Sequence, residues 1–579
     1  MRRSRRRHEG AGPGDQVGAV GLTVLTPFLR CTGVSWTTDG RGRPRAADRL
    51  LTYGVGVDRY DYVVVGAGSA GCVMAGRLSE GGTTRVLLLE AGPTDRKMEV
   101  RIPAAFPKLF KTERDWDYVT APQPHLDDRE LYWPRGRMLG GCSSINAQMY
   151  VRGNPADYDG WAAAGNTGWS WAEVLPYFRR SEHHGRGGDA EHGTDGPLFV
   201  EELRDPSPLT TAAVEAAVQA GIPRLADVNG PTQDGVAMSE VTQHRGRRWS
   251  AADAFLRPAR KRRNLVVVTG AHATRVLFDG TRAVGVEYRE GERMRQATVA
   301  REVIVCGGSV NSPQLLMLSG VGPRDALDAL GIYAVVDLPG VGADLQDHLV
   351  APAIFTTGDH ASLLDAEKPA QLAKYLSRRK GMLTSNVGEA MAFVRTTEAL
   401  PAPDLQLIFA PVEYIDHGLA PPPGHGLSIG GVLLQPASRG CITLASGDPF
   451  AAPVIDAGYL TERADMAPLV EAIKLSRRIA AQPALSGIVD GEMWPGPGVL
   501  SDDDIEAFVR QQAFTLYHPV GTCRMGTDDG AVVDPELRVR GVDGLRVVDA
   551  SVMPTIPRGN TNAPTIMIAE RAADLVKAG

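Results

Sequence analysis

The hydrophobic pattern of the chain changes sharply near residue 60. Residues 1–56 begin with the basic run MRRSRRR and hold one weakly apolar stretch, residues 17–29, which glycines interrupt and which is too short to cross a bilayer. From Tyr60 on, the chain has an apolar run, then closely spaced glycines, then apolar residues at helical spacing through residues 73–78. This order predicts a strand, a tight turn and a helix, so we expect folded structure to begin at Tyr60.

Residues 1–56 are interpreted as a disordered or non-native extension, with the true start near Val55 or Val57. The arginines and the apolar stretch also fit a twin-arginine export signal, but no small-residue cleavage site follows cleanly. The six cysteines are scattered without a CxxC pair, which argues against a zinc site and against a disulfide framework. We therefore expect a cytoplasmic protein without stable membrane insertion, and export is the alternative.

The turn after the first strand has the spacing of a dinucleotide-binding loop, Gly66-x-Gly68-x-x-Gly71. In such a loop the first glycine makes the turn, the second lets the backbone approach a pyrophosphate, and the third lets the helix pack on the strand. The next apolar run, RVLLLEAG, ends in Glu90, whose carboxylate can accept hydrogen bonds from ribose hydroxyls and would repel the extra phosphate of NADP. FAD, NAD and a βαβ unit without a ligand all remain open at this point. The residues expected to contact the cofactor are Gly66, Gly68, Ser69, Ala70, Gly71, Glu90 and Ala91.

Length and charge narrow the class of protein. At 579 residues the chain exceeds the size at which one hydrophobic core keeps growing, so two substantial domains or one domain with large insertions are expected. A net charge of −6 gives no general attraction for nucleic acid. Residues 181–195, with His183, His184 and His192, could hold a metal ion, but the interleaved glycines favour a solvated loop, so no metal is predicted.

Two longer motifs point to a family. The first, RGRMLGGCSSIN, spans residues 135–146, and the second, GSVNSPQLLMLSGVG, spans residues 308–322. Over both motifs, and nearly throughout from Tyr60 to the C-terminus, the chain resembles the glucose-methanol-choline (GMC) oxidoreductases, FAD enzymes that oxidise alcohols. The resemblance implies an α/β chain with a Rossmann-like FAD-binding domain and an α+β substrate part built as a discontinuous antiparallel-sheet domain. The implied segments are residues 57–153, 244–349 and 501–579 for the FAD-binding domain, and residues 154–243 and 350–500 for the substrate-binding domain.

The resemblance also implies how FAD is held. Paired glycines and small hydroxyl residues in the first motif let main-chain N–H groups approach a planar cofactor. Some relatives tether FAD through a histidine at the position of Ile145, so noncovalent FAD is predicted. Ser312-Pro313 in the second motif predicts a helix start, and a later helix N-terminus should stabilise negative charge on the flavin. The further residues implied to contact FAD are Leu139, Gly140, Gly141, Asn146, Ala273, Asp549, Ala550, Pro564 and Thr565.

The stretch LYHPVGTCRMG, residues 516–526, resembles the family segment that carries the catalytic acid/base, which places this role on His518. An alcohol gives up a hydride readily only as its O–H proton leaves, and an imidazole that titrates near neutrality can accept that proton while flavin N5 receives the hydride. The match places a second polar group, which orients the substrate oxygen, on Asn562. Helix capping is the competing interpretation of that asparagine.

We therefore expect FAD-dependent oxidation of a primary alcohol to an aldehyde, by a dehydrogenase rather than an oxidase, with a quinone, a dye or O2 as electron acceptor. A hydroxynitrile lyase of the same fold and a choline-specific dehydrogenase are the alternatives. Residues 381–397 should form a wall of the substrate cavity. Glu389 in this wall could attract a cationic substrate, but a structural glutamate is favoured because no tryptophan and tyrosine cage is evident.

Overall fold

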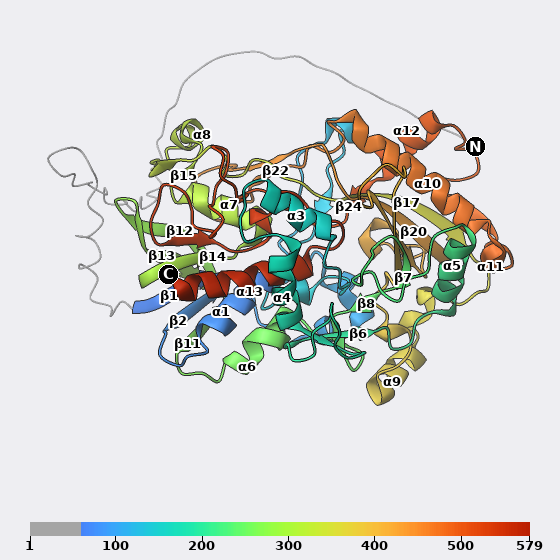
Figure 1. Cartoon of the computed structure of the whole chain (residues 1–579), viewed down its shortest axis with the longest axis horizontal. Helices are drawn as coiled ribbons and strands as arrows, with labels where there is room; N and C mark the ends of the chain where they lie inside the picture. The colour runs from blue at the N-terminus through green and yellow to red at the C-terminus, as the bar shows by residue number, and fades with distance from the viewer. Residues whose placement is uncertain (1–58) are drawn as a thin grey trace, which may run out of the picture. The chain divides into compact units, whose positions relative to one another are not determined.

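The computed structural model describes residues 59–579, and the predictions made for residues 1–56 lie outside this part of the chain. No helix among the described residues is long and apolar enough to cross a membrane. Two seven-stranded sheets organise the described chain (Figure 1).

The first sheet grows from the predicted strand, turn and helix. Strands β1 (Arg59–Val65) and β2 (Val86–Glu90) are parallel, and α1 (Ser69–Leu78) connects them, which confirms the prediction from the glycine spacing. The strand order is β11-β2-β1-β14-β13-β12, with β25 paired to β14. Every residue of β2 is buried, as expected for a parallel strand covered on both faces. The remaining strands are β11 (Leu265–Thr269), β12 (Ala271–Asp279), β13 (Arg282–Glu290), β14 (Arg293–Val305) and β25 (Leu545–Val547).

The second sheet has the order β23-β17-β20-β19-β18-β7, with β24 paired to β17, and all its pairings are antiparallel. The mixed architecture confirms the predicted fold class. The domain boundaries stay a prediction, and β24 comes from a segment assigned to the FAD-binding domain. The strands are β7 (Gly235–Met238), β17 (Leu349–Thr356), β18 (Ala390–Val394), β19 (Leu405–Ala410), β20 (Gly426–Leu433), β23 (Gly491–Trp494) and β24 (Phe514–Thr515).

Two helices position the site. The last helix, α13 (Asn562–Ala578), lies against α1 and α4 (Trp171–Ser181) (Figure 1). Helix α7 (Gly308–Leu318) begins at Gly308, four residues before the predicted start at Ser312. The earlier start has a physical cause, because the N–H groups of Gly307 and Gly308 donate to the side chains of Ser312 and Asp549 and need no helical partner.

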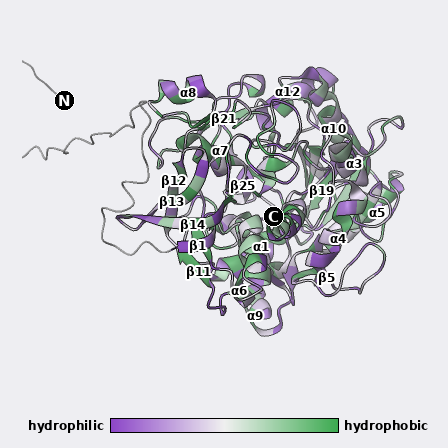
Figure 2. Ribbon diagram, turned by 60° about the vertical axis from the view of Figure 1, so that its left-hand side comes forward, coloured by the Kyte–Doolittle hydropathy of each residue, from purple (hydrophilic) through white to green (hydrophobic). Residues whose placement is uncertain are grey.

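The other helices lie mostly around the two sheets. Figure 2 shows hydrophilic residues on α8 (Arg324–Ala329) and α12 (Asp502–Gln512), whose outer faces contact water. The further longer helices are α3 (Pro155–Ala163), α5 (Pro208–Gln219), α9 (Pro369–Arg378) and α10 (Met466–Ala480).

Candidate active site

A cavity of about 320 Å³ lies between the two sheets. On one side it is lined by the turn after β1, the end of β2 and the loop after β14. On the other side it is lined by residues of β17, β19 and β20. The carboxyl ends of parallel strands are where open α/β sheets bind ligands. The cavity therefore joins the predicted nucleotide-binding edge to the predicted substrate-side sheet.

The three glycines of the first turn have three different surroundings. Gly66 has a φ of +97°, and a Cβ there would lie 2.4 Å from the carbonyl oxygen of Cys306. A Cβ on Gly71 would lie 1.8 Å from the carbonyl oxygen of Gly66, so this glycine lets α1 pack on the turn. A Cβ on Gly68 would meet nothing within 4 Å, and this residue lines the cavity. Gly68 thus leaves open the space that a pyrophosphate needs.

Of the residues predicted for this unit, Gly71 does not line the cavity, because its place is the contact between α1 and the turn. Glu90 is buried, and its two oxygens accept hydrogen bonds from the backbone N–H groups of Ala67 at 2.9 Å and Gly92 at 2.8 Å. Burial raises the pKa of Glu90 to about 7, although both N–H groups oppose the rise. The residues that line the cavity as predicted are Gly66, Gly68, Ser69, Ala70, Glu90 and Ala91.

The first long motif lies directly against the glycine turn. The N–H of Gly140 donates to the carbonyl of Ala67 at 2.7 Å, and a Cβ on Gly141 would lie 2.6 Å from the Cα of Gly68. Gly141, Ile145 and Asn146 line the cavity. Leu139 and Gly140 do not line it: the N–H of Gly140 holds the motif against the turn, and the N–H of Leu139 donates to the carbonyl of Pro93.

Two further predicted contacts differ in detail from expectation. Asp549 lines the cavity, but the protein itself supplies hydrogen-bond donors to its carboxylate. These donors are the N–H of Gly308, the N–H and the hydroxyl of Ser551, and the hydroxyl of Ser312 at 2.6 Å. The cofactor is therefore not needed to satisfy this carboxylate. Pro564 does not line the cavity, whereas Ala273, Ala550 and Thr565 do.

These residues fit FAD. The open space at Gly68, the buried carboxyl of Glu90 and the N-terminal turn of α13 together offer an unobstructed backbone, a ribose partner and a partial positive charge. Ile145 is buried and has no nucleophilic atom.

His518 lies in the cavity wall, in the loop after β24. Its Nε2 is 3.2 Å from Nδ2 of Asn560, and its Nδ1 is 3.0 Å from Nδ1 of His348. Its backbone N–H donates to Asp347 at 2.7 Å, which holds the loop in place. Burial lowers the pKa of His518 well below its ordinary value, and the neighbouring His348 and Arg135 lower it further. The imidazole is therefore neutral, and able to accept a proton, at neutral pH.

Asn560, and not the predicted Asn562, faces the histidine. Asn562 is the first residue of α13, and its Oδ1 accepts a hydrogen bond from the Ser69 hydroxyl at 2.7 Å. Asn560 belongs to the preceding loop, and its amide reaches His518. Both asparagines line the cavity, but the helix start turns the Asn562 side chain toward the glycine turn.

The sequence analysis missed three further polar residues of the site. Asp347 and His348 precede β17, and a polar pair directly before a buried apolar run was their one signal in the sequence. Arg248 is buried, and its guanidinium donates to Asn146 at 2.8 Å and to the carbonyl of Val100 at 3.0 Å. Burial lowers the pKa of Arg248 to about 9. No local pattern in the sequence distinguishes this arginine from its neighbours.

The wall near His518 is aromatic and aliphatic. Among the described residues, Glu90 and Asp549 are the only carboxylates that line the cavity, and both lie among the predicted FAD contacts. Of residues 381–397, which were predicted to form a wall of the cavity, Val387 and Gly388 line it. The apolar lining residues on this side are Phe106, Phe110, Ile145, Met149, Val387, Ile408, Ala410, Tyr414, Phe514, Leu516 and Tyr517.

Glu389 has the structural surroundings that were favoured for it. It is buried and accepts hydrogen bonds from the Ser207 N–H at 2.8 Å and the Thr210 hydroxyl at 2.7 Å. It does not line the cavity. A cationic substrate in the cavity therefore has no contact with this carboxylate.

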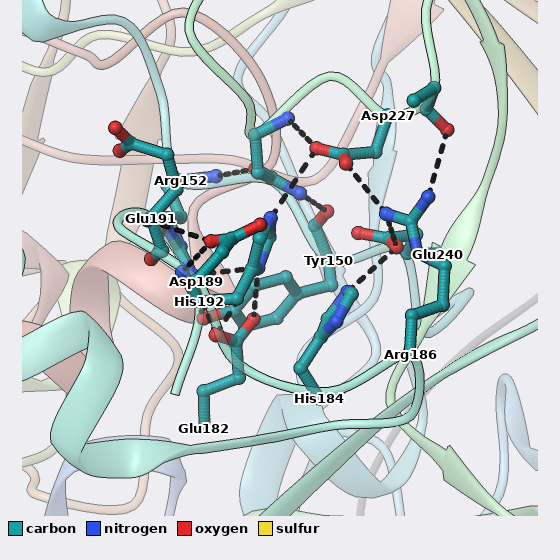
Figure 3. A network of polar contacts seen from close by, with 12 residues as sticks. Tyr150, Arg152, Glu182, His184, Arg186, Asp189, Glu191, His192, Asp227 and Glu240 are labelled. Atoms are coloured by element: carbon teal, nitrogen blue, oxygen red, sulfur yellow. Dashed lines mark hydrogen bonds and ion pairs between the residues drawn. The ribbon is translucent and has the colours of Figure 1, made fainter. Parts of the chain in front are cut away.

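The histidine-rich segment is only in part the solvated loop that its glycines suggested: residues 185–190 are exposed, whereas Glu182, His184 and His192 are buried. These residues place potential metal ligands within 4.8 Å of one another. Arginines occupy the same space: Arg152 lies 2.7 Å from Glu182 and 3.2 Å from the ring of His192. The result is an ion-pair network (Figure 3) rather than a set of free ligands. Its other charged members are Arg186, Asp227 and Glu240.

The fold and the cavity define a dinucleotide-binding enzyme whose cofactor site adjoins a neutral histidine. Comparison with known proteins names the family: the family models described as GMC oxidoreductase match residues 60–350 and 436–569. The chain belongs to the GMC oxidoreductases, and FAD is its cofactor.

Individual relatives agree. The chain is 46% identical to alcohol dehydrogenase [acceptor] of Pseudomonas putida, over 89% of this chain and 95% of that protein. It is also 46% identical to mitochondrial choline dehydrogenase of Homo sapiens, over 90% of each. Among solved structures, pyridoxine 4-oxidase from Mesorbium loti superposes with a TM-score of 0.83 at 34% identity, over 90% of this chain and 99% of that one.

Proposed function

We propose that this chain oxidises an uncharged primary alcohol to an aldehyde, with His518 as the proton acceptor. The observation that carries the proposal is the pair formed by the neutral imidazole and the Asn560 amide at the cavity wall, 3.2 Å apart. One oxygen atom can contact two groups at that separation.

In this reaction the alcohol O–H takes the place of the Asn560 amide as the donor to Nε2 of His518, which accepts the proton as the C–H bond breaks. The Asn560 amide donates to the same oxygen and stabilises the negative charge that develops there. FAD bound in the cavity would supply the two-electron acceptor for the hydride. The buried wall excludes water and positions the carbon that loses the hydride.

The apolar wall supports an aromatic or extended aliphatic alcohol. Choline stays the alternative, because the rings of Phe106, Phe110, Tyr414 and Tyr517 could face a quaternary ammonium. Arg135 lines the same cavity and would repel such a cation. We therefore expect neutral alcohols to have the higher kcat/KM in a substrate panel that includes choline.

We propose a dehydrogenase that holds FAD noncovalently. The P. putida relative, which is named for an acceptor, supports the first point, and the side chain of Ile145 supports the second. Acid precipitation should release all the flavin into the supernatant. Stoichiometric peroxide after air is admitted to the reduced enzyme would argue for an oxidase.

The proposal is tested by anaerobic flavin reduction in the purified holoprotein. Alcohols that fit the cavity should bleach the flavin absorbance, whereas a hydroxynitrile lyase would leave the oxidised spectrum unchanged. His518→Ala should keep its FAD and lose about 10²- to 10⁴-fold in the rate of reduction. Near-normal reduction in that variant contradicts the role of His518.

The pH dependence follows from the lowered pKa of His518. A base with a depressed pKa stays unprotonated until the pH falls below that value. In the wild type kcat/KM should therefore be level through pH 6.5 and decline only in more acidic solution. A decline centred at or above pH 6.5 would contradict this assignment.

A further inference from the structure

We propose that His348 sets the tautomer of His518 and thereby leaves Nε2, the nitrogen beside Asn560, as the proton acceptor. This inference rests on the proposed function for its consequence in catalysis. The tautomer itself is inferred only from hydrogen bonds within the protein.

A backbone carbonyl fixes which ring nitrogens donate and which accept in this chain of hydrogen bonds. Nε2 of His348 lies 3.1 Å from the carbonyl oxygen of Leu434, which follows β20. A carbonyl oxygen can only accept, so this nitrogen of His348 carries a hydrogen. In a neutral imidazole the other nitrogen, Nδ1, then has a free lone pair.

His348 is neutral because its surroundings disfavour a charge. The ring is fully buried, and burial lowers the pKa of His348 to about 3. The carboxylate next to it in sequence, Asp347, is committed to the backbone N–H of His518 and to the hydroxyls of Thr515 and Tyr459. Arg135 acts on the other ring of the pair, because it lowers the pKa of His518.

The lone pair of His348 decides the state of the next ring. Its Nδ1 lies 3.0 Å from Nδ1 of His518, and the rings meet edge to face at 82° with centroids 5.2 Å apart. Two lone pairs cannot share this contact, so Nδ1 of His518 carries its hydrogen. Nε2 of His518 is left unprotonated.

The last contact agrees with this direction. Nδ2 of Asn560 is an amide donor and faces Nε2 of His518 at 3.2 Å. The chain therefore runs in one sense, with Asn560 donating to His518, His518 to His348, and His348 to Leu434. The acceptor in each hydrogen bond thus determines the protonation of the group that donates to it. Without His348, His518 could protonate on Nε2 and present no base to the alcohol.

The state of the ring can be read directly. Histidine-selective 15N labelling of the oxidised holoprotein, with signals assigned through His518→Ala and His348→Leu, distinguishes protonated from unprotonated ring nitrogens. We expect Nδ1 of His518 to be protonated in the wild type and both tautomers to be populated in His348→Leu. A wild-type His518 protonated on Nε2 would overturn the inference.

Kinetics give an independent readout. His348→Leu should lower kcat by about 10²-fold with little change in KM, because the base, and not the binding surface, is disturbed. In His348→Asn the side-chain oxygen falls near the position of Nδ1 and can accept from His518, so most of the activity and the single tautomer should return. His125→Leu, at an exposed histidine, is the control and should change neither.

Failure of the inference and failure of the proposed function are separable. If no alcohol reduces the flavin but Nδ1 of His518 is protonated, the proposed function is wrong and the inference stands. If alcohols reduce the flavin and His348→Leu keeps both the wild-type tautomer and the wild-type kcat, the inference is wrong.

Discussion

At the scale of single residues, the proposed reaction depends on which amide faces His518. Asn560, in the loop before α13, and Asn562, the first residue of that helix, are separated by one residue, yet Asn560 contacts the imidazole and Asn562 contacts Ser69. Their contributions should therefore differ in kind. In the proposed function Asn560 orients the substrate oxygen, whereas Asn562 joins the start of α13 to Ser69.

Asn560→Ala should lower kcat/KM by about 10²- to 10³-fold, the usual cost of losing one donor to a developing oxyanion. Asn562→Ala is the matched control and should keep most of kcat while FAD dissociates more readily, because the Ser69 contact is lost. Steady-state kinetics with saturating FAD and a measured FAD dissociation constant separate the two. A larger loss of kcat in Asn562→Ala would restore the assignment made from the sequence.

At the scale of elements, different glycines of the turn serve folding and cofactor binding. Gly71 serves the contact of α1 with the turn, and Gly68 serves the open cavity. This distinction follows from what a side chain would meet at each position, since the residue type is the same.

Gly71→Ala should destabilise the protein even without FAD, by about 3 kcal/mol, because its Cβ would lie 1.8 Å from a backbone oxygen that cannot move freely. Gly68→Ala should leave the apoprotein as stable as the wild type and weaken FAD binding, since its Cβ would enter the cavity. Urea unfolding of the apoproteins and FAD titration measure the two effects. Equal loss of apoprotein stability in both variants would contradict the assignment of Gly71 to packing and of Gly68 to cofactor binding.

At the scale of the whole described chain, the buried ion-pair network joins segments that are far apart in sequence (Figure 3). His192 lies 3.2 Å from Glu182 and 3.7 Å from Asp227. Although burial lowers the pKa of His192, the contacts with Asp227 and Glu182 outweigh it and raise the pKa from 6.5 to about 9. At neutral pH the network therefore holds a charged His192 beside Glu182 and Asp227.

The raised pKa makes stability depend on pH in a definite direction. The charged His192 contributes its full stabilisation below pH 6.5, and this contribution is lost as the pH rises through about 9. The change is on the order of 3 kcal/mol, because each pKa unit corresponds to about 1.4 kcal/mol. The free energy of unfolding should fall between pH 6.5 and 9 in the wild type.

His192→Gln should flatten this part of the stability profile, and His125→Gln at the exposed control position should not. Urea unfolding at a series of pH values measures both. An unchanged slope in His192→Gln would show that the ring is neutral in the folded protein.

The sequence by itself determined the features whose causes are local. The apolar run, the glycine spacing and the helical period lie within a few turns of chain, so they predicted β1, the turn, α1 and the carboxyl at the end of β2 correctly. The long motifs predicted the family and its cofactor correctly, because many positions matched at once.

Only the tertiary structure decided the contacts between side chains. His518 meets a histidine 170 residues away and an asparagine 42 residues away, and Asp549 takes its donors from the start of α7. Where a loop side chain points depends on backbone angles and on packing against distant segments, which spacing along the chain does not encode. For this reason the sequence could predict that His518 belongs to the site, whereas it could not predict the amide beside this residue or the histidine behind it.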